Sequence, residues 1–209
     1  MAVMDYLTKR MSASFLRLGA LMVCILLHLG APAWAAPTPL KLKAGVFEPP
    51  AAAPEFALHG SNGTDLKLAD YRGKLVLLLF GFTHCPEVCP TTLATLAEAR
   101  KALGKEADAV QVVYVTVDPE RDDVGRIKKY LAAFDTSFVG GTAKPQVLEA
   151  MRKRYGVVAA KLESPTGGYG MNHSTSVFFI DRVGRLRAMM PYGHGAKDFV
   201  HDLRLLAAQ

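Results

Sequence analysis

The sequence LVLLLFGFTHCPEVCP occupies residues 75–90 and contains the most informative pattern of the chain. Its first six residues are continuously apolar, which is typical of a strand buried on both faces of a sheet that helices cover. A short loop follows, and Pro86 and Pro90 are both compatible with the first turn of a helix. We therefore expect a buried strand, a loop that carries two cysteines, and a helix from about Pro86 or Pro90 to Leu103.

Later apolar segments continue this alternation of strands and helices. Residues 110–117 (VQVVYVTV) predict a second buried strand, and residues 175–180 and 186–190 predict the two strands of a hairpin. The other expected elements are helices over residues 124–134, 144–155 and 196–208, a short strand near 157–159 and a loop over 164–170.

An additional hairpin is predicted ahead of the first buried strand. Residues 55–58 and 66–68 are strand-like and flank the turn signal Asn62-Gly63. Strand–helix units followed by an antiparallel hairpin and a closing helix indicate an α/β fold, in which helices flank a mixed sheet. This is the thioredoxin-like arrangement, here with an added N-terminal hairpin.

Composition excludes several classes of protein. A chain of 209 residues, 50% hydrophobic and 21% charged, is neither disordered, nor collagen-like, nor a long coiled coil. Its 25 Lys and Arg against 19 Asp and Glu give a net charge of +6, but these residues form no dense basic block. Nucleic-acid binding is therefore not indicated.

The N-terminus has the pattern of a targeting segment. Basic residues precede an apolar run over residues 18–29, and an Ala-Trp-Ala sequence ends at Ala35. Residues 1–35 are therefore expected to be either a cleaved signal peptide or an uncleaved membrane anchor that spans residues 15–34. Both alternatives export the rest of the chain.

Two further segments complete the predicted organisation. Residues 36–54 are rich in Pro and Ala without periodicity, so we expect a linker. Residues 55–209 would then form the thioredoxin-like domain. Of the three cysteines, Cys24 lies in the N-terminal apolar run, which leaves Cys85 and Cys89 in the exported part.

Cys85 and Cys89 are spaced to act together. Residues four apart share one face of a helix, so the two sulfurs can converge on one point. Free N–H groups at a helix start favour the thiolate form. The pair can thus form a disulfide or bind a soft metal ion such as Cu(I).

His173 is our candidate for a third ligand. It lies in the sequence MNHST, directly before the strand predicted from residue 175, and in a thioredoxin-like sheet that loop lies beside the start of the first helix. Two thiolates and one imidazole would hold both Cu(I) and Cu(II). The alternative is a redox dithiol without metal, with His173 in a structural role.

The charged sequence Asp118-Pro119-Glu120-Arg121-Asp122 follows the second buried strand. Sites in open α/β sheets gather at this end of the strands. Either one Asp caps the next helix, or the segment forms a charged rim that orients a partner or supports the cysteine site.

Three segments together resemble the Sco/SenC family of copper chaperones for cytochrome c oxidase assembly: GFTHCPEVCP at residues 81–90, VDPERD at 117–122 and NHS at 172–174. The resemblance runs from about residue 50 to the C-terminus. It implies that Cys85, Cys89 and His173 hold copper as Cu(I), Cu(II) or both. It also implies a periplasmic protein that meets a copper-receiving oxidase subunit, with its binuclear copper centre, or another periplasmic copper carrier.

One position departs from the family pattern. The family usually has an acidic residue directly before its histidine, where this chain has Asn172. An amide steadies an imidazole less than a carboxylate does. We therefore expect either weaker Cu(II) binding or no contact between Asn172 and the ring.

Competing activities remain open. A metallochaperone passes its metal by ligand exchange and needs no acid–base pair. We therefore expect a metal carrier and not an enzyme that uses acid–base catalysis. We also expect this carrier to be a monomer. A thiol–disulfide reductase would instead use the dithiol Cys85 and Cys89 to keep the cysteines of a copper-receiving protein reduced. A thiol peroxidase would place Thr83 and Arg121 near Cys85, a weak match.

Overall fold

The computed structural model describes residues 41–163 and 167–209, and Leu40–Gln209 forms one compact unit. The expected signal peptide or anchor at residues 1–35, including residues 15–34, lies outside the described residues, as does Cys24. Within the described ranges, no helix combines the length and the hydropathy that a membrane crossing requires.

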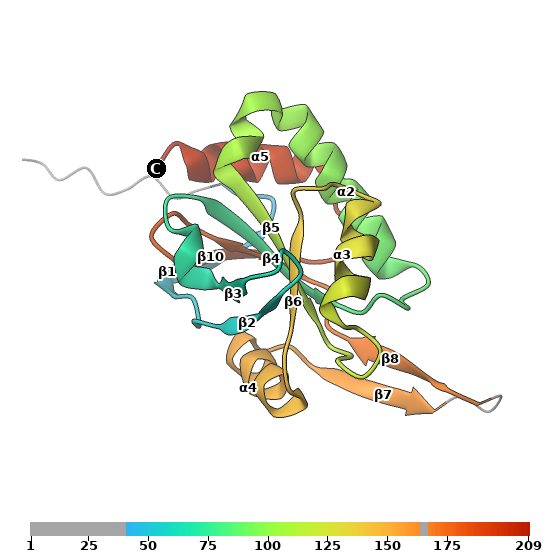
Figure 1. Ribbon diagram of the computed structural model, residues 1–209. Helices are drawn as coiled ribbons and strands as arrows, with labels where there is room; N and C mark the ends of the chain where they lie inside the picture. The colour runs from blue at the N-terminus through green and yellow to red at the C-terminus, as the bar shows by residue number, and fades with distance from the viewer. Residues whose placement is uncertain (1–40, 164–166) are drawn as a thin grey trace, which may run out of the picture. The chain divides into compact units, whose positions relative to one another are not determined.

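An eight-stranded mixed sheet forms the centre of the molecule (Figure 1), with strand order β1-β10-β9-β4-β5-β6-β2-β3. The pairs β4–β5 and β5–β6 are parallel, and the other pairs are antiparallel. The strands of this sheet are β1 (Gly45–Ala52), β2 (Ala57–Gly60), β3 (Asp65–Lys67), β4 (Leu75–Gly81), β5 (Val110–Thr116), β6 (Val139–Thr142), β9 (Val177–Ile180) and β10 (Arg185–Met190).

Helices cover both faces of this sheet, and a two-stranded sheet stands apart from it at one side (Figure 1). The two-stranded sheet consists of β7 (Ala159–Glu163) and β8 (Tyr169–His173). The helices are α2 (Val88–Leu103), α3 (Val124–Ala132), α4 (Pro145–Tyr155), α5 (Ala196–Ala207) and the short 3₁₀ helices η1 (Leu68–Tyr71) and η2 (Gly104–Ala109).

Strand β4 shows why the sheet is buried on both faces. Every residue of β4 is buried, and successive side chains point to opposite faces. Leu75, Leu77 and Leu79 pack with α2, α3 and α5, whereas Val76 and Leu78 pack with α4. The predicted α/β fold, with a mixed sheet flanked by helices, is confirmed.

The expected linker over residues 36–54 is wrong for its second half, because β1 forms there. Pro49 and Pro50 suggested an irregular segment. However, β1 lies at the edge of the sheet, where a strand needs a partner on one side only and tolerates proline. It pairs with β10 through Val46 and Ala51, with a shift in register between them. The N-terminal hairpin β2–β3 is confirmed.

Strand β6 was not predicted, because two of its four residues are glycines, which are unfavourable inside a strand. Both glycines are buried and pack too closely for a side chain. A Cβ on Gly140 would lie 2.4 Å from Ile127 of α3, and a Cβ on Gly141 would lie 2.9 Å from Leu66 of β3. The glycines therefore leave room for Ile127 of α3 beside Gly140 and for the side chain of Leu66 beside Gly141.

The β7–β8 hairpin also departs from expectation. The sequence predicted a short strand near residues 157–159 followed by a loop, whereas two paired strands extend from Ala159 to His173 around the undescribed residues 164–166. Most side chains of β7 are exposed, so the hairpin has no apolar alternation that would have indicated it. His173 is consequently the last residue of a strand and not part of a loop.

Gly140→Ala should destabilise the protein by about 1–3 kcal/mol, because the added methyl group overpacks the interface between β6 and α3. Gly45→Ala, in the edge strand β1, is the control, since its Cβ would meet only Met189 O at 3.6 Å. Urea unfolding of both variants measures the difference. Equal stability for the two would contradict this packing of β6.

Candidate metal centre

Three potential ligands meet at the junction of β4, α2 and β8. Cys85 lies in the loop between β4 and α2, Cys89 in the first turn of α2, and His173 at the end of β8. Their ligand atoms all lie within 4.8 Å of one another. Cys89 Sγ is 3.6 Å from His173 Nε2, and the N–H of Cys89 donates to Cys85 Sγ at 3.4 Å. Both cysteines are free thiols.

The loop that carries Cys85 is fixed by the buried carboxylate of Asp122. The N–H and the hydroxyl of Thr83 donate to this carboxylate at 2.9 and 2.6 Å, and the hydroxyl of Thr116 donates at 2.7 Å. The N–H of Cys85 also donates to Phe82 O at 3.1 Å. Asp122 thus supports the cysteine site, which was one of the two interpretations of its segment.

The helix cap proposed in the other interpretation comes from a neighbouring residue. Asp123 accepts a hydrogen bond from the N–H of Arg126 at 2.7 Å and caps α3. The two roles are therefore divided between adjacent carboxylates: Asp122 points inward to the cysteine loop, and Asp123 serves the helix.

The imidazole of His173 is oriented by its own chain. Nδ1 lies 2.8 Å from Ser174 O, and because a carbonyl only accepts, Nδ1 carries the proton. The lone pair of Nε2 therefore faces Cys89. The ring of Phe82 meets the imidazole edge-on, with 5.8 Å between centroids.

Asn172 does not contribute to this arrangement. It is exposed, and it precedes His173 in a strand, where successive side chains point to opposite faces. The Ser174 carbonyl instead accepts the hydrogen bond from Nδ1 of His173 and so orients the ring. The second of the two expectations for Asn172, no contact with the ring, agrees with this geometry.

Arg121 joins the hairpin to the rest of the site. Its guanidinium pairs with the buried carboxylate of Asp118 and donates to Tyr169 O at 2.9 Å. It also stacks on the Tyr169 ring, with Cζ 3.8 Å from the centroid, and the Tyr169 hydroxyl donates to Asp118 at 2.8 Å. The segment that holds the cysteine loop therefore also holds the strand that ends in His173.

The two thiols of the metal-free site differ in acidity. The pKa of Cys85 falls to about 5, chiefly because the Cys89 thiol donates a hydrogen bond to it; nearby backbone N–H groups add to this effect. The pKa of Cys89 rises, because its proton is shared with Cys85 and the side chain is buried. At neutral pH the pair therefore carries one thiolate and one thiol.

The other candidate ligands lie outside this group. His84 has 41% of its side chain exposed and lies 4.0 Å from Asp122. His194 and His201 pair with their neighbours Asp198 and Asp202. Within residues 41–163 and 167–209, Cys85, Cys89 and His173 form the one cluster of three or more such side chains close enough to share a metal ion.

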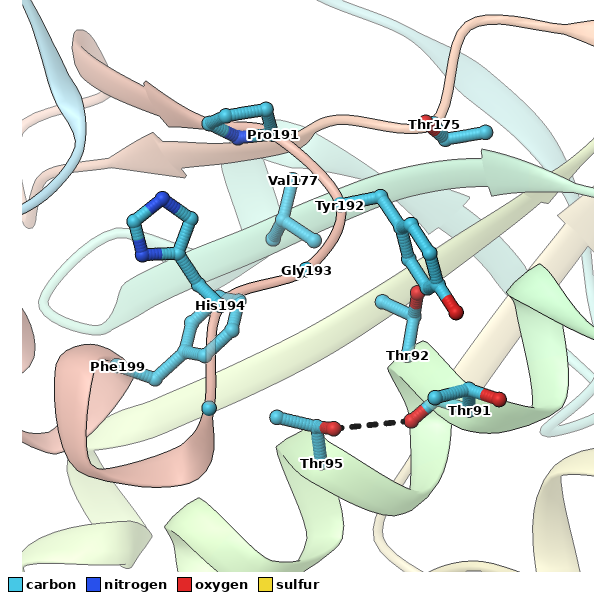
Figure 2. A pocket seen from close by; sticks show the side chains of 11 residues that line it. Thr91, Thr92, Thr95, Thr175, Val177, Pro191, Tyr192, Gly193, His194 and Phe199 are labelled. Carbon is cyan, nitrogen blue, oxygen red and sulfur yellow. Dashed lines mark hydrogen bonds between the residues drawn. The ribbon is translucent and has the colours of Figure 1, made fainter.

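A cavity of about 280 Å³ lies along α2, and none of the three ligands lines it (Figure 2). Thr91, Thr92 and Thr95 line it from the helix, and the loop that begins at Pro191 lines it from the other side, with Tyr192 above the threonines. Its lining contains neither a cysteine nor a carboxylate, and its imidazole, that of His194, pairs with Asp198. The cavity therefore adds no ligand to the group of Cys85, Cys89 and His173.

The donor set defines the chemistry of the centre. Two sulfurs and one imidazole nitrogen suit a soft or borderline metal ion, and the two sulfurs alone suit a disulfide. Cys89 is 3% exposed, whereas Cys85 and His173 are partly exposed, so an incoming group can reach two of the three ligands.

Comparison with known proteins agrees with this geometry. The family described as SCO1/SenC matches residues 46–208. The mitochondrial SCO2 homolog of Mus musculus is 33% identical over 153 residues, which cover 72% of this chain and 60% of the mouse protein. The chain therefore spans less than two thirds of that relative.

Two solved structures are similar in fold and sequence. Bradyrhizobium japonicum ScoI with copper bound is 34% identical, with a TM-score of 0.69, and the match covers 75% of this chain and 99% of that one. Apo Sco1 of Thermus thermophilus is 33% identical, with a TM-score of 0.71, over 84% and 99% of the two chains.

Alkylation of the metal-free protein should reveal the acidic Cys85 thiol. Its rate should stay near its maximum from neutral pH down to about pH 6 and reach half that value near pH 5, because the thiolate is the reactive form and its pKa is about 5. Mass spectrometry after iodoacetamide treatment locates the label, and Cys85→Ser is the control. A midpoint near 8.5, the ordinary value for cysteine, would be incompatible with the geometry.

Arg121→Ala should loosen the hairpin while the central sheet stays intact. Amide hydrogen exchange in Tyr169–His173 should accelerate at least tenfold, since the hydrogen bond to Tyr169 O and the stacking that hold β8 are both lost. Lys128→Ala, on the exposed face of α3, serves as the matched control. Unchanged exchange in β8 would show that Arg121 does not hold the hairpin.

Proposed function

The chain belongs to the SCO1/SenC family, and from this membership we propose that it is a copper-binding metallochaperone of cytochrome c oxidase assembly. It carries one copper ion on Cys85, Cys89 and His173. It delivers this ion to the binuclear copper centre of a respiratory oxidase subunit or to another periplasmic copper carrier.

The convergence of these three ligand atoms within 4.8 Å is the observation that carries the proposal. Two thiolates satisfy Cu(I), which is soft and tolerates low coordination, and the imidazole adds the harder donor that Cu(II) requires. The copper-bound state of Bradyrhizobium japonicum ScoI, whose fold matches this chain, supports the choice of metal.

Delivery proceeds by ligand exchange. A thiolate or imidazole of the receiving protein displaces one ligand of the carrier at a time, so no bond other than metal–ligand bonds is broken and no general base is needed. The partial exposure of Cys85 and His173 supports this route, because an incoming ligand can reach the metal beside them.

The proposed location is the periplasm. The basic and apolar pattern of residues 1–35 supports export, with the carrier either released by cleavage or anchored through residues 15–34. We propose a monomer, since all three ligands come from one chain.

A thiol–disulfide reductase is the second candidate, and the unequal acidity of the two thiols favours it. The Cys85 thiolate would attack a disulfide of the copper-receiving protein and release one partner thiolate. Cys89, losing its proton, would then attack the mixed disulfide. The products are a Cys85–Cys89 disulfide and a reduced partner dithiol, a balanced two-electron exchange.

Substitution of the ligands should separate the two oxidation states. Loss of a residue that only hydrogen-bonds to a metal ligand costs ~10–100-fold in metal affinity. Cys85→Ala and Cys89→Ala each remove a ligand itself, so each should weaken Cu(I) binding by more than this. His173→Ala should weaken Cu(II) binding by a similar factor and Cu(I) binding by less than about tenfold, because two thiolates suffice for Cu(I). Competition with a Cu(I) chelator and Cu(II) titration measure the constants.

His84→Ala is the matched control, since this histidine adjoins Cys85 but lies outside the ligand group. It should bind both ions like the parent. If all variants bind copper like the parent, the ligand assignment is wrong. If the parent binds no copper but reduces an oxidised peptide containing the two cysteines of a binuclear copper centre, the reductase is the correct function.

A further inference from the structure

Tyr114 is a fully buried residue with a polar group near the ligands. It lies on β5, and the whole residue is 0% exposed. Its hydroxyl is buried and has no hydrogen-bond partner among the described residues. A buried hydroxyl without a hydrogen-bond partner lowers the stability of the folded state. Such groups are rare in folded proteins, so each one requires an explanation.

The hydroxyl and the sulfur of Cys89 both lie close to Gly81. A Cβ placed on Gly81, the last residue of β4, would be 2.8 Å from the Tyr114 hydroxyl oxygen and 2.9 Å from Cys89 Sγ. Both atoms therefore border the same small space, and it stays open only because residue 81 has no side chain. The same sulfur is 3.6 Å from His173 Nε2.

We propose that Tyr114 is a positioning residue of the copper site, whose hydroxyl donates a hydrogen bond to the Cys89 thiolate once a metal ion is bound. The inference rests on the proposed copper-binding function. The hydrogen bond withdraws electron density from the sulfur, makes it a weaker donor to Cu(II), and so shifts the balance of the site toward Cu(I).

The Cys89 sulfur becomes a better hydrogen-bond acceptor when a metal ion binds, because a neutral thiol is only a weak acceptor. Metal binding removes the thiol proton to solvent and leaves a thiolate, which is a strong acceptor. The phenol then gains a partner while keeping its own proton, so no redox change of Tyr114 is involved.

Tyr130 provides a matched control. Its ring centroid lies 6.0 Å from that of Tyr114, and its hydroxyl is likewise buried without a partner among the described residues. Its side chain is not among the three atoms nearest to a Cβ on Gly81, whereas the Tyr114 hydroxyl is. Tyr130→Phe therefore removes a similar hydroxyl from the same region without removing the proposed donor.

The test compares Tyr114→Phe, Tyr130→Phe and the parent, each loaded with Cu(II). Tyr114→Phe should shift the sulfur-to-copper charge-transfer band to lower energy, because the thiolate loses a stabilising donor. The ratio of Cu(II) to Cu(I) affinity should rise roughly fivefold, the order expected for one hydrogen bond. Tyr130→Phe should leave the band and the ratio at the parent's values.

Each failure has a different meaning. A parent without a charge-transfer band rejects the copper site and the inference with it. A parent band that Tyr114→Phe leaves unchanged rejects the inference alone, as does an equal shift in Tyr130→Phe. Unfolding of the metal-free variants provides a further readout: Tyr114→Phe should be no less stable than the parent, because its hydroxyl has no partner to lose.

A second measurement does not depend on the folding of Tyr114→Phe. Adding colourless Zn(II) to Tyr130→Phe should shift tyrosine absorption to lower energy, since a phenol that donates a new hydrogen bond absorbs there. Cys89→Ala in the same background should abolish the shift. Absence of the shift in Zn(II)-loaded Tyr130→Phe would overturn the proposal.

Discussion

The carboxylate of Asp122 is fully buried and accepts three hydrogen bonds, two from Thr83 and one from Thr116. A hydrogen bond to a charged group contributes about 1.5–3 kcal/mol, whereas fixing one residue of backbone costs about 1–2 kcal/mol. Three such bonds therefore offset the ordering of several loop residues. They hold the loop that carries Cys85 against the end of β5, and the position of Cys85 depends on this attachment.

The same charged segment also fixes the other half of the site. Among the residues that the structure describes, the β7–β8 hairpin pairs with no strand of the main sheet, so its position depends on side-chain contacts such as those of Arg121 with Tyr169. Because Arg121 and Asp122 are adjacent, the hairpin and the cysteine loop are attached to a common support. The separation of Cys89 and His173, which are 84 residues apart in sequence, is thereby set by a few residues after β5.

Parts of the fold with a strong local pattern were predictable. Strands β4 and β5 are continuous apolar runs, and the spacing of Cys85 and Cys89 with the distant His173 indicated the ligand group. Elements whose stability comes from their neighbours were missed: β1 contains prolines that only an edge strand tolerates, β6 contains glycines that only close packing explains, and β7 is exposed. A tyrosine inside an apolar strand looks like an ordinary core residue, so only coordinates relate Tyr114 to Cys89.

The three ligands differ in accessibility in a way that suits a carrier. Cys89 lies in the core with the Tyr114 hydroxyl nearby, whereas Cys85 and His173 are partly exposed at the end of a loop and of a hairpin. In the proposed transfer, an incoming ligand replaces an exposed group first while Cys89 retains the metal. A site with three equally buried ligands would bind copper but release it slowly. One with three exposed ligands would lose it to any competing thiol. The buried sulfur thus determines how tightly the metal ion is retained, and the two partly exposed ligands determine how fast it is delivered.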